Sequence, residues 1–549
     1  MIFSRFRRRG SALLVAGAAA AVVPLLAQGD AAMYRGNSGL TGAYAEEIAL
    51  PLSLEWKHTT TYFGYNPTSP IVAGDTVFFS SGNRLFAVST ETGSLKWRYP
   101  QDLPLTTTFA STPAFHAGTI FAGAAEGKLY AINAETGKLA WQFDTRSTIE
   151  TSPTVVDGIV YVGSGNGRVW AIDGRNGREV STWRGGFQAS DEISGAPAVA
   201  NGFVYVLSMD QVLHAIGAAT GKERWFYRLP GSVLRMSPVA YQEYVVVANG
   251  PNLTSFLGRN GLVRWTRVLN EDIVASPAVS DDGIFVVTAD NRVMAFETRT
   301  GRPKWKSSPQ LEFDVLAAPT LAGKALLVGT AQGGIYGLDT ESGATKWTYV
   351  VLPSTVRPDS IVPYTNLASP LVVANKTLYA LSDDGTVSAF RADAVDNSGP
   401  VITEREPEMG VVINGTPPLR FEATVLDEGS GVKPDSVRLL IDRNGVARKP
   451  TTSRVANDAP GFSYDVLTGT LEYTTSEATA AGRVDQLADG RHTVTVTASD
   501  WRGNTASRSW SFTVDNSLAK VARRRPATTP GGRPGRSGGA GGGKLGDGG

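Results

Sequence analysis

One eleven-residue phrase, AxxxxTGxxxW, recurs along the chain and limits its fold more than any other feature of the sequence. Four complete copies end at Trp97, Trp141, Trp225 and Trp305, as in AINAETGKLAW over residues 131–141. With the looser copies, the series of tryptophans is Trp56, Trp97, Trp141, Trp183, Trp225, Trp265, Trp305 and Trp347. A return of about forty residues, filled with short β-rich runs, indicates repeated units that pack on their neighbours.

Each repeat is predicted to form four strands. Residues 152–161 (SPTVVDGIVY) place a proline before one extended run, an Asp-Gly turn after it and a second β-rich run beyond the turn. A third strand such as 129–132 follows, and the TG turn then leads into the strand that carries the tryptophan. The opening prolines are Pro70, Pro113, Pro153, Pro197, Pro238, Pro277, Pro319 and Pro370. Units of this kind in series predict the blades of an all-β propeller.

Tryptophans and opening prolines both number eight, but they are out of phase. Trp56 precedes the first proline, whereas the last unit, residues 370–390, has no tryptophan. The simplest closure makes the N-terminal strand around Trp56 the outer strand of the last blade, which joins the two ends of the repeat region and leaves no open ring. The sequence therefore predicts an eight-bladed propeller over residues 33–395.

The glycine and the tryptophan of the phrase are assigned structural roles. The glycine supplies the positive φ that a tight hairpin requires. The indole buries a large apolar area between neighbouring blades, and its N–H needs a backbone acceptor. In GREVSTW the tryptophan, Trp183, stands two residues later than in the other copies, which predicts a bulge in that blade.

The repeat resembles the tryptophan-docking repeat of the pyrroloquinoline-quinone (PQQ) propeller superfamily over about residues 40–395. That resemblance implies either a quinoprotein dehydrogenase or a cofactor-free member, such as the propeller lipoprotein of the outer-membrane barrel-assembly machinery. In the dehydrogenases the quinone stacks on a ring of adjacent cysteines beside a calcium ion, whereas this chain has no cysteine and its even repeat spacing leaves little sequence for a cofactor pocket. We expect no cofactor, with PQQ and calcium as the alternative.

The N-terminus has the pattern of an export signal. A basic stretch over residues 5–9 precedes an apolar run over 12–26 and small residues up to Ala32. We expect a signal peptide over residues 1–32, no transmembrane segment after its removal, and a periplasmic or extracellular protein. The 52 Lys and Arg residues nearly balance the 51 Asp and Glu residues, so no field of one sign attracts nucleic acid.

The connections between each tryptophan and the next opening proline are expected to surround one mouth of the central channel. They vary most between the repeats, and their acidic residues with scattered aromatic side chains suit a peptide, a strand edge or a cation. Solvated loops would have the same composition, so both interpretations stay open. The candidate binding residues are Tyr62, Phe63, Tyr65, Glu150, Asp191, Glu192, Arg235, Asp272, Asp314 and Asn366.

After Phe390 the repeat stops and the pattern changes to strands of clean alternation, such as residues 494–498. The phrases over 427–437 and 489–514 resemble bacterial immunoglobulin-like domains, which implies a β-sandwich over residues 396–518 that serves as a spacer or an adhesive module.

Asp427, Glu428 and Asp500 have two interpretations within that domain, as calcium ligands or as surface carboxylates of turns. Residues 519–549 are rich in Gly, Pro and Arg and are expected to form a disordered tail.

These patterns favour an exported, non-catalytic binding or assembly scaffold that presents its propeller to a protein or cell-envelope partner. The four histidines lie far apart without metal-ligand spacing, so no catalytic, cofactor-binding or metal-binding residue is assigned. The alternatives are a PQQ-dependent dehydrogenase and cell-surface adhesion through the immunoglobulin-like domain.

Overall fold

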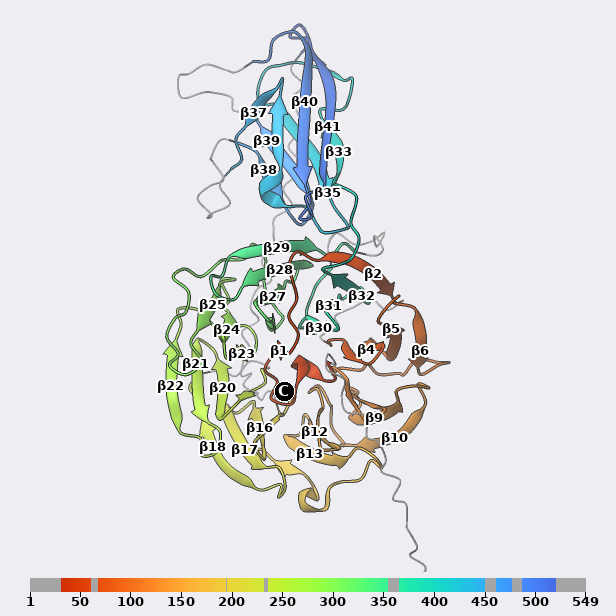
Figure 1. Ribbon diagram of the computed structural model, residues 1–549, viewed down its shortest axis with the longest axis vertical. Helices are drawn as coiled ribbons and strands as arrows, with labels where there is room; N and C mark the ends of the chain where they lie inside the picture. The colour runs from red at the N-terminus through yellow and green to blue at the C-terminus, as the bar shows by residue number, and fades with distance from the viewer. Residues whose placement is uncertain are drawn as a thin grey trace, which may run out of the picture.

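The computed structural model describes residues 31–60, 68–193, 195–231, 236–353, 365–449, 461–475 and 486–519. Within them the chain is all β, and a ring of sheets carries an elongated sandwich on one side (Figure 1). The helical elements among these residues are three short 3₁₀ turns, η1 (Tyr34–Gly36), η2 (Ser181–Trp183) and η3 (Pro434–Ser436). None of the helices in the described part of the chain is long and apolar enough to span a membrane.

The described residues of the ring form eight sheets, which we number in chain order. Sheet 1 holds β3 (Ile71–Ala73), β4 (Thr76–Ser81), β5 (Arg84–Ser89) and β6 (Leu95–Tyr99). Sheet 2 holds β7 (Ala114–His116), β8 (Thr119–Gly123), β9 (Lys128–Asn133) and β10 (Leu139–Asp144). Sheet 3 holds β11 (Thr154–Val156), β12 (Ile159–Gly163), β13 (Arg168–Asp173) and β14 (Phe187–Gln188). Sheet 4 holds β15 (Ala198–Ala200), β16 (Phe203–Ser208), β17 (Val212–Gly217) and β18 (Glu223–Arg228).

The second half of the ring continues the same plan. Sheet 5 holds β19 (Val239–Tyr241), β20 (Tyr244–Asn249), β21 (Asn252–Leu257) and β22 (Val263–Val268). Sheet 6 holds β23 (Ala278–Ser280), β24 (Gly283–Val287) and β25 (Val293–Phe296). Sheet 7 holds β1 (Ala43–Tyr44), β26 (Thr320–Ala322), β27 (Ala325–Gly329), β28 (Gly334–Asp339) and β29 (Thr345–Val350). Sheet 8 holds β30 (Val372–Ala374), β31 (Thr377–Leu381), β32 (Thr386–Arg391) and β2 (Ser53–Thr59).

The burial of the strands follows their place in the ring. Middle strands such as β8 and β9 are buried along most of their length, whereas outer strands such as β10 alternate between exposed and half-buried residues. The middle strands are covered by neighbouring sheets on both faces, which is why they are near-continuous apolar runs. One shared core joins Phe78 of sheet 1 to Ile120 and Tyr130 of sheet 2, and similar clusters lie between other neighbouring sheets.

The ring closes through its N-terminal strand, as predicted. β2 pairs antiparallel with β32, and Trp56 lies opposite Ala389 in that ladder. Sheet 8 is therefore built from the two ends of the repeat region, so its outer edge is completed by residues more than 300 positions away in the chain.

Two blades have irregular outer strands, and sheet 7 departs from the predicted four-strand plan because it gains β1 as a fifth strand. In the described residues, sheet 6 lacks an outer strand. The pairing continues past Pro303, where the Lys304 N–H donates to the Ala295 carbonyl at 2.8 Å, and it ends at a bend over residues 305–307. In sheet 3, Trp183 belongs to the 3₁₀ turn η2, and the outer strand is reduced to β14. The late tryptophan predicts an irregularity at this place, and the irregularity is a helical turn rather than a bulge.

A segment outside the repeat pattern, residues 31–44, runs through the middle of the ring (red in Figure 1), and its first two residues belong to the expected signal peptide. Its carbonyl oxygens accept hydrogen bonds of 2.7–3.0 Å from inner-strand N–H groups of six sheets, namely those of Val72, Phe115, Val199, Ala240, Val279 and Leu321. These contacts begin at Ala31, two residues before the expected start of the propeller. We call residues 31–44 the plug.

The described residues between 401 and 514 form a sandwich of two sheets that share one apolar core, which includes Phe421, Val494 and Trp510. One sheet has the order β33 (Val401–Glu406), β35 (Arg420–Leu426), β39 (Thr470–Thr474) and β38 (Ser463–Asp465). The other has the order β34 (Val412–Ile413), β41 (Thr505–Val514), β40 (Gly490–Ser499), β36 (Arg438–Ile441) and β37 (Asn444–Val446). Its assignment to the immunoglobulin-like domains stays a prediction.

Candidate functional site

The repeat tryptophans dock on the turn of the next blade. Trp97, for example, donates its indole N–H to the Ala134 carbonyl oxygen at 2.8 Å, and a Cβ added to Gly137 would lie 2.7 Å from its ring. The acceptors for Trp56, Trp97, Trp141, Trp183, Trp225, Trp265 and Trp305 are the carbonyls of Thr90, Ala134, Gly174, Ala218, Gly258, Thr298 and Thr340. These indoles therefore serve blade packing, which supports the structural role that we expect for them.

The eighth tryptophan has a different partner. Because β2 enters sheet 8 from the far end of the chain, that sheet has no hairpin turn of its own between β32 and its outer strand. Trp347 instead donates to the carbonyl oxygen of Ser430, in a loop of the sandwich, at 3.0 Å. Gly431 follows with a φ of +85°, and the Tyr349 hydroxyl donates to the Glu428 carbonyl at 2.9 Å. The sandwich thus supplies the turn that the closed ring lacks.

A cavity of about 470 Å³ opens at the axial mouth of the ring. Its walls are the segments that precede the inner strands of sheets 2 to 8, and one side of it is closed by Tyr34 of the plug. Its lining consists mainly of small or hydroxyl side chains such as Thr112, Ser152, Ser237 and Ser276. The cavity therefore lies at the mouth that the sequence predicts to be surrounded by these connections.

The structure places the candidate rim residues as follows. Glu150 lines the cavity and is exposed. Asp191, Asp272 and Asp314 are also exposed, whereas Glu192 and Asn366 are half-buried. The Asn366 side-chain amide donates to the Asp383 carboxylate at 2.6 Å, and the Asn291 side-chain amide donates to the Asp314 carboxylate at 3.0 Å. Tyr62, Phe63, Tyr65 and Arg235 lie outside the described residues.

Sequence reasoning missed the hydroxyl groups of the cavity wall, although they left a signal. Six of the eight opening prolines are preceded by Ser or Thr. In the structure these hydroxyls join one blade to the next, since the Ser69 N–H donates to Thr112 Oγ1 at 2.8 Å and the Ser237 N–H donates to Ser276 Oγ at 2.9 Å. The Ser/Thr-Pro pair therefore marks the residues that surround the axis. Leu316, 53% exposed beside the cavity, left no comparable signal.

Ser208, His214 and Glu223 are connected like a hydrolase triad, but their surroundings do not fit catalysis. His214 Nε2 lies 3.2 Å from Ser208 Oγ, and Nδ1 lies 2.7 Å from the Glu223 carboxylate. Ser208 is fully buried, and its hydroxyl also donates to Asp210 two residues on. Thr288 with Asp290 and Ser382 with Asp384 form the same turn in sheets 6 and 8, so the serine is a turn residue.

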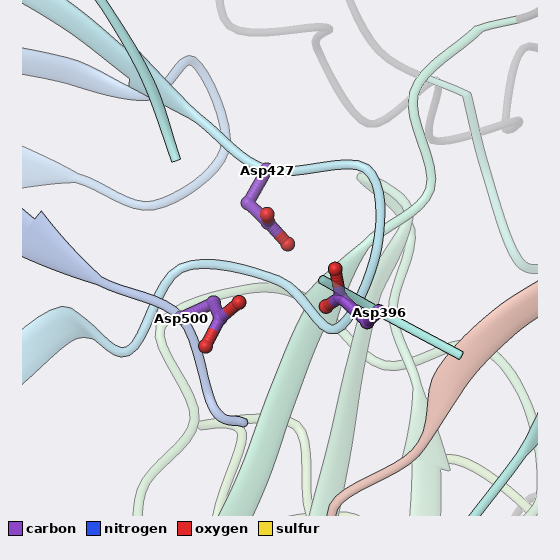
Figure 2. A group of neighbouring side chains, drawn as sticks. All are labelled: Asp396, Asp427 and Asp500. Atoms are coloured by element: carbon purple, nitrogen blue, oxygen red, sulfur yellow. The ribbon is translucent and has the colours of Figure 1, made fainter. Parts of the chain in front are cut away.

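Three carboxylates from separate segments meet where the sandwich contacts the ring. Asp396 precedes β33, Asp427 follows β35 and Asp500 follows β40, and one oxygen of each lies within 4.8 Å of the others. Figure 2 shows the three side chains turned toward one another. Burial, followed by the charges of Asp396 and Asp500, raises the pKa of Asp427 to about 6. Glu428, also considered from the sequence, is not part of this cluster.

The described lining of the mouth offers PQQ hydroxyl donors but no cation. This quinone carries three carboxylates, for which cationic side chains are the strongest partners. Among the described residues that line the cavity there is no Lys, Arg or His, and Glu150 is acidic. The buried guanidinium of Arg35 is directed at the carbonyl oxygens of Leu40, Thr41, Ser276 and Pro277 instead.

Comparison with known proteins adds the following findings. A family model described as "Outer membrane protein assembly factor BamB" matches residues 102–189, 180–266 and 235–411, which is more than half of the chain. None of the curated proteins matches the chain.

Three solved structures share the fold. BamB from Moraxella catarrhalis is 19% identical with a TM-score of 0.51, and the match covers 62% of this chain and 100% of that one. A europium-containing methanol dehydrogenase is 14% identical with a TM-score of 0.53, over 64% of this chain and 89% of that one. The quinohemoprotein alcohol dehydrogenase from Comamonas testosteroni is 13% identical with a TM-score of 0.54, over 71% and 84%. Such identities indicate a common fold alone.

Proposed function

This chain belongs to the protein family described as outer membrane protein assembly factor BamB, and we propose that it is an exported, non-catalytic scaffold that binds a protein partner at the mouth of its ring. The leader expected over residues 1–32 supports export, although residues 1–30 lie outside the described part of the chain.

The observation that carries this proposal is the chemistry of the mouth. The plug occupies the axis of the ring, and its Tyr34 lines the cavity of about 470 Å³ that a ligand meets at the mouth. The wall offers small neutral side chains and the exposed Leu316, while Asp191, Asp272 and Asp314 stand exposed around it. A centre of small and hydroxyl side chains with a charged rim is able to receive a polar protein segment. Carboxylates at the rim favour a partner segment that carries Lys or Arg.

Site-specific photocrosslinking in the native cell envelope tests the proposal. A photoreactive side chain at Asp272, on the mouth side of sheet 6, should capture a defined protein. The same group at Asp282, an exposed residue in the turn at the opposite end of that sheet, is the matched control. Equal capture at both positions would contradict a binding site at the mouth.

The captured protein, once purified, should bind the chain in solution. Asp272→Lys should weaken this binding about tenfold or more, since a rim carboxylate becomes a cation, while Asp282→Lys should leave it unchanged. Dye reduction by the purified chain after addition of PQQ and calcium would instead favour the dehydrogenase alternative.

A further inference from the structure

The contact between the ring and the sandwich concentrates negative charge in a place with little water. Asp500 is 1% exposed, and Asp396 and Asp427 are half-buried. The charged neighbours that act most on the pKa of Asp427 are both carboxylates, Asp396 and Asp500. The nearby hydroxyl of Tyr349 is under the same influence, since burial and then the negative charges of Glu428, Asp427 and Asp396 raise its pKa. Like charges held this close repel one another unless a cation or a proton lies between them.

The hydrogen bonds of the cluster leave one carboxylate oxygen unsatisfied. Asp427 accepts from the Gly431 N–H at 2.7 Å, and Asp500 accepts from Asn504 at 2.8 and 2.7 Å. By contrast, Oδ2 of Asp396 is fully buried and has no hydrogen-bond partner among the described residues. A buried carboxylate oxygen without a donor is destabilising unless it is paired with a cation.

Further unpartnered polar atoms lie around the same contact. Ser430, fully buried in the loop that carries Asp427, has a hydroxyl without a partner among the described residues, and so do the Thr348 hydroxyl and the Trp501 indole N–H. With Asp396 they make four of the twelve such atoms found in the described chain. A cavity of about 20 Å³ touches Asp427 but neither Asp396 nor Asp500, and most of its lining is apolar. The buried oxygens of Asp396, Ser430 and Thr348 that have no partner among the described residues are therefore what indicates a missing polar ligand.

We propose that Asp396, Asp427 and Asp500 bind a divalent cation, Ca²⁺, which fastens the sandwich to the ring. Ca²⁺ prefers carboxylate, hydroxyl and carbonyl oxygens at about 2.4 Å, so two oxygens on opposite sides of the ion are about 5 Å apart. The mutual separation of at most 4.8 Å among the three carboxylate oxygens fits that geometry. The three ligands come from the linker and from two loops of the sandwich, and the loop of Asp427 also carries the Ser430 carbonyl that accepts Trp347. An ion here would hold that docking loop in place.

The test uses the full mature chain at pH 7.5, after removal of divalent ions with EDTA. Titration with Ca²⁺ should show one ion bound per chain, with a Kd below about 1 mM, and 5 mM Ca²⁺ should raise Tm by about 3 °C or more. An equal Tm in Ca²⁺ and in EDTA would overturn the proposal.

Asp396→Asn is the decisive variant because it keeps the shape of the side chain and removes one charge. We expect its Kd for Ca²⁺ to be at least tenfold higher than that of the parent chain. In EDTA its Tm should be no lower than that of the parent chain, because the repulsion between the carboxylates is relieved. The matched control is Glu408→Gln, which removes an exposed carboxylate of the sandwich outside the cluster and should keep the full Ca²⁺ response.

A shared proton is the competing explanation and gives a different result. In that case the Tm of the parent chain in EDTA would rise as the pH falls from 7.5 to 5.5, and Ca²⁺ would have no effect at either pH. Retention of the Ca²⁺ response by Asp396→Asn would likewise overturn the proposed ligand set.

Discussion

At the scale of single residues, the repeat is explained by one contact between a glycine and an indole. Gly93, Gly137 and Gly261 have positive φ, and a Cβ on any of them would lie within 2.7 Å of the tryptophan of the preceding blade. The glycine is therefore needed twice, for the turn and for the close approach of the ring. The sequence predicts the first need, whereas only the packed structure shows the second.

Comparing Gly137→Ala with Gly118→Ala separates the need for positive φ from the need for close approach of the indole. Gly137→Ala should destabilise the protein by about 3 kcal/mol, since the methyl group adds a clash with Trp97 to the backbone strain. Gly118→Ala is the control, because Gly118 has a φ of +78° with open space around it, and should cost about 1 kcal/mol. Urea unfolding of the two variants measures the difference, and equal losses would contradict the role of the indole contact.

His492 gives the stability of the sandwich a pH dependence. Its Nδ1 lies 2.5 Å from the Asp442 carboxylate and its Nε2 lies 2.7 Å from the Ala488 carbonyl, so both ring nitrogens must donate. Burial opposes the charge, but the hydrogen bonds to Ala488 and Asp442 outweigh it and raise the pKa of His492. Because the pKa of His492 is higher in the folded than in the unfolded protein, protonation stabilises the folded state. This stabilisation is complete below the unfolded-state pKa of about 6.5, and it is lost as the pH rises through the folded-state pKa.

We therefore expect His492→Gln to lower the free energy of unfolding by about 1 kcal/mol at pH 6 and by less at pH 9. Urea unfolding at both values measures this. His116→Gln, which removes a histidine of the ring, is the control. A loss that grows with pH would contradict the charged state of His492.

At the scale of elements, the blades differ in their outer strands. In sheet 6 the pairing continues past Pro303 to Lys304 and ends at the bend over residues 305–307, although the sequence keeps the repeat phrase there as GRPKW. The partner of Trp347 is not visible in the sequence, because the phrase DEGSG lies 80 or more residues away in another domain and has no TG turn. Its Gly431 has the positive φ of the repeat glycines, but a Cβ on it would lie nearest the Thr348 carbonyl and the Tyr349 ring rather than the indole.

Trp347→Phe should uncouple the sandwich from the ring. Loss of the indole N–H leaves the buried Ser430 carbonyl without that donor and costs about 1 to 2 kcal/mol. Trp225→Phe removes the equivalent bond to Gly258 within the ring and should cost about the same. Only Trp347→Phe should increase protease cleavage in the linker 391–400, by about tenfold if docking is weakened by 1.4 kcal/mol. Equal cleavage in both variants would contradict the docking role of Trp347.

At the scale of the whole molecule, the plug holds the eight sheets together at their axis. It hydrogen-bonds to inner strands of six sheets, and Arg35 at its centre is 1% exposed. Burial lowers the pKa of Arg35, and the guanidinium is satisfied by backbone carbonyls of the plug itself and of the segment before β23. A ring with such a centre is stabilised from inside as well as between neighbouring blades.

Arg35→Met should therefore be strongly destabilising, by about 3 to 5 kcal/mol, because it leaves several buried carbonyls without a donor. Thermal unfolding measures the loss. Arg175→Met is the control, since Arg175 is exposed in a turn of sheet 3 and pairs with Asp173, and it should change Tm far less. Similar shifts in Tm for both variants would show that the plug adds little to stability.

The sequence by itself determined the all-β class, the propeller repeat, the closure through Trp56 and the side of the ring on which the variable connections lie. Each of these depends on a contact that every unit makes with its neighbour, so it leaves a periodic trace in the chain. Only the tertiary structure decided the plug, the turn that receives Trp347 and the meeting of Asp396, Asp427 and Asp500. Each of these joins residues far apart in the chain and is made once, and a contact made once has no period from which it could be inferred.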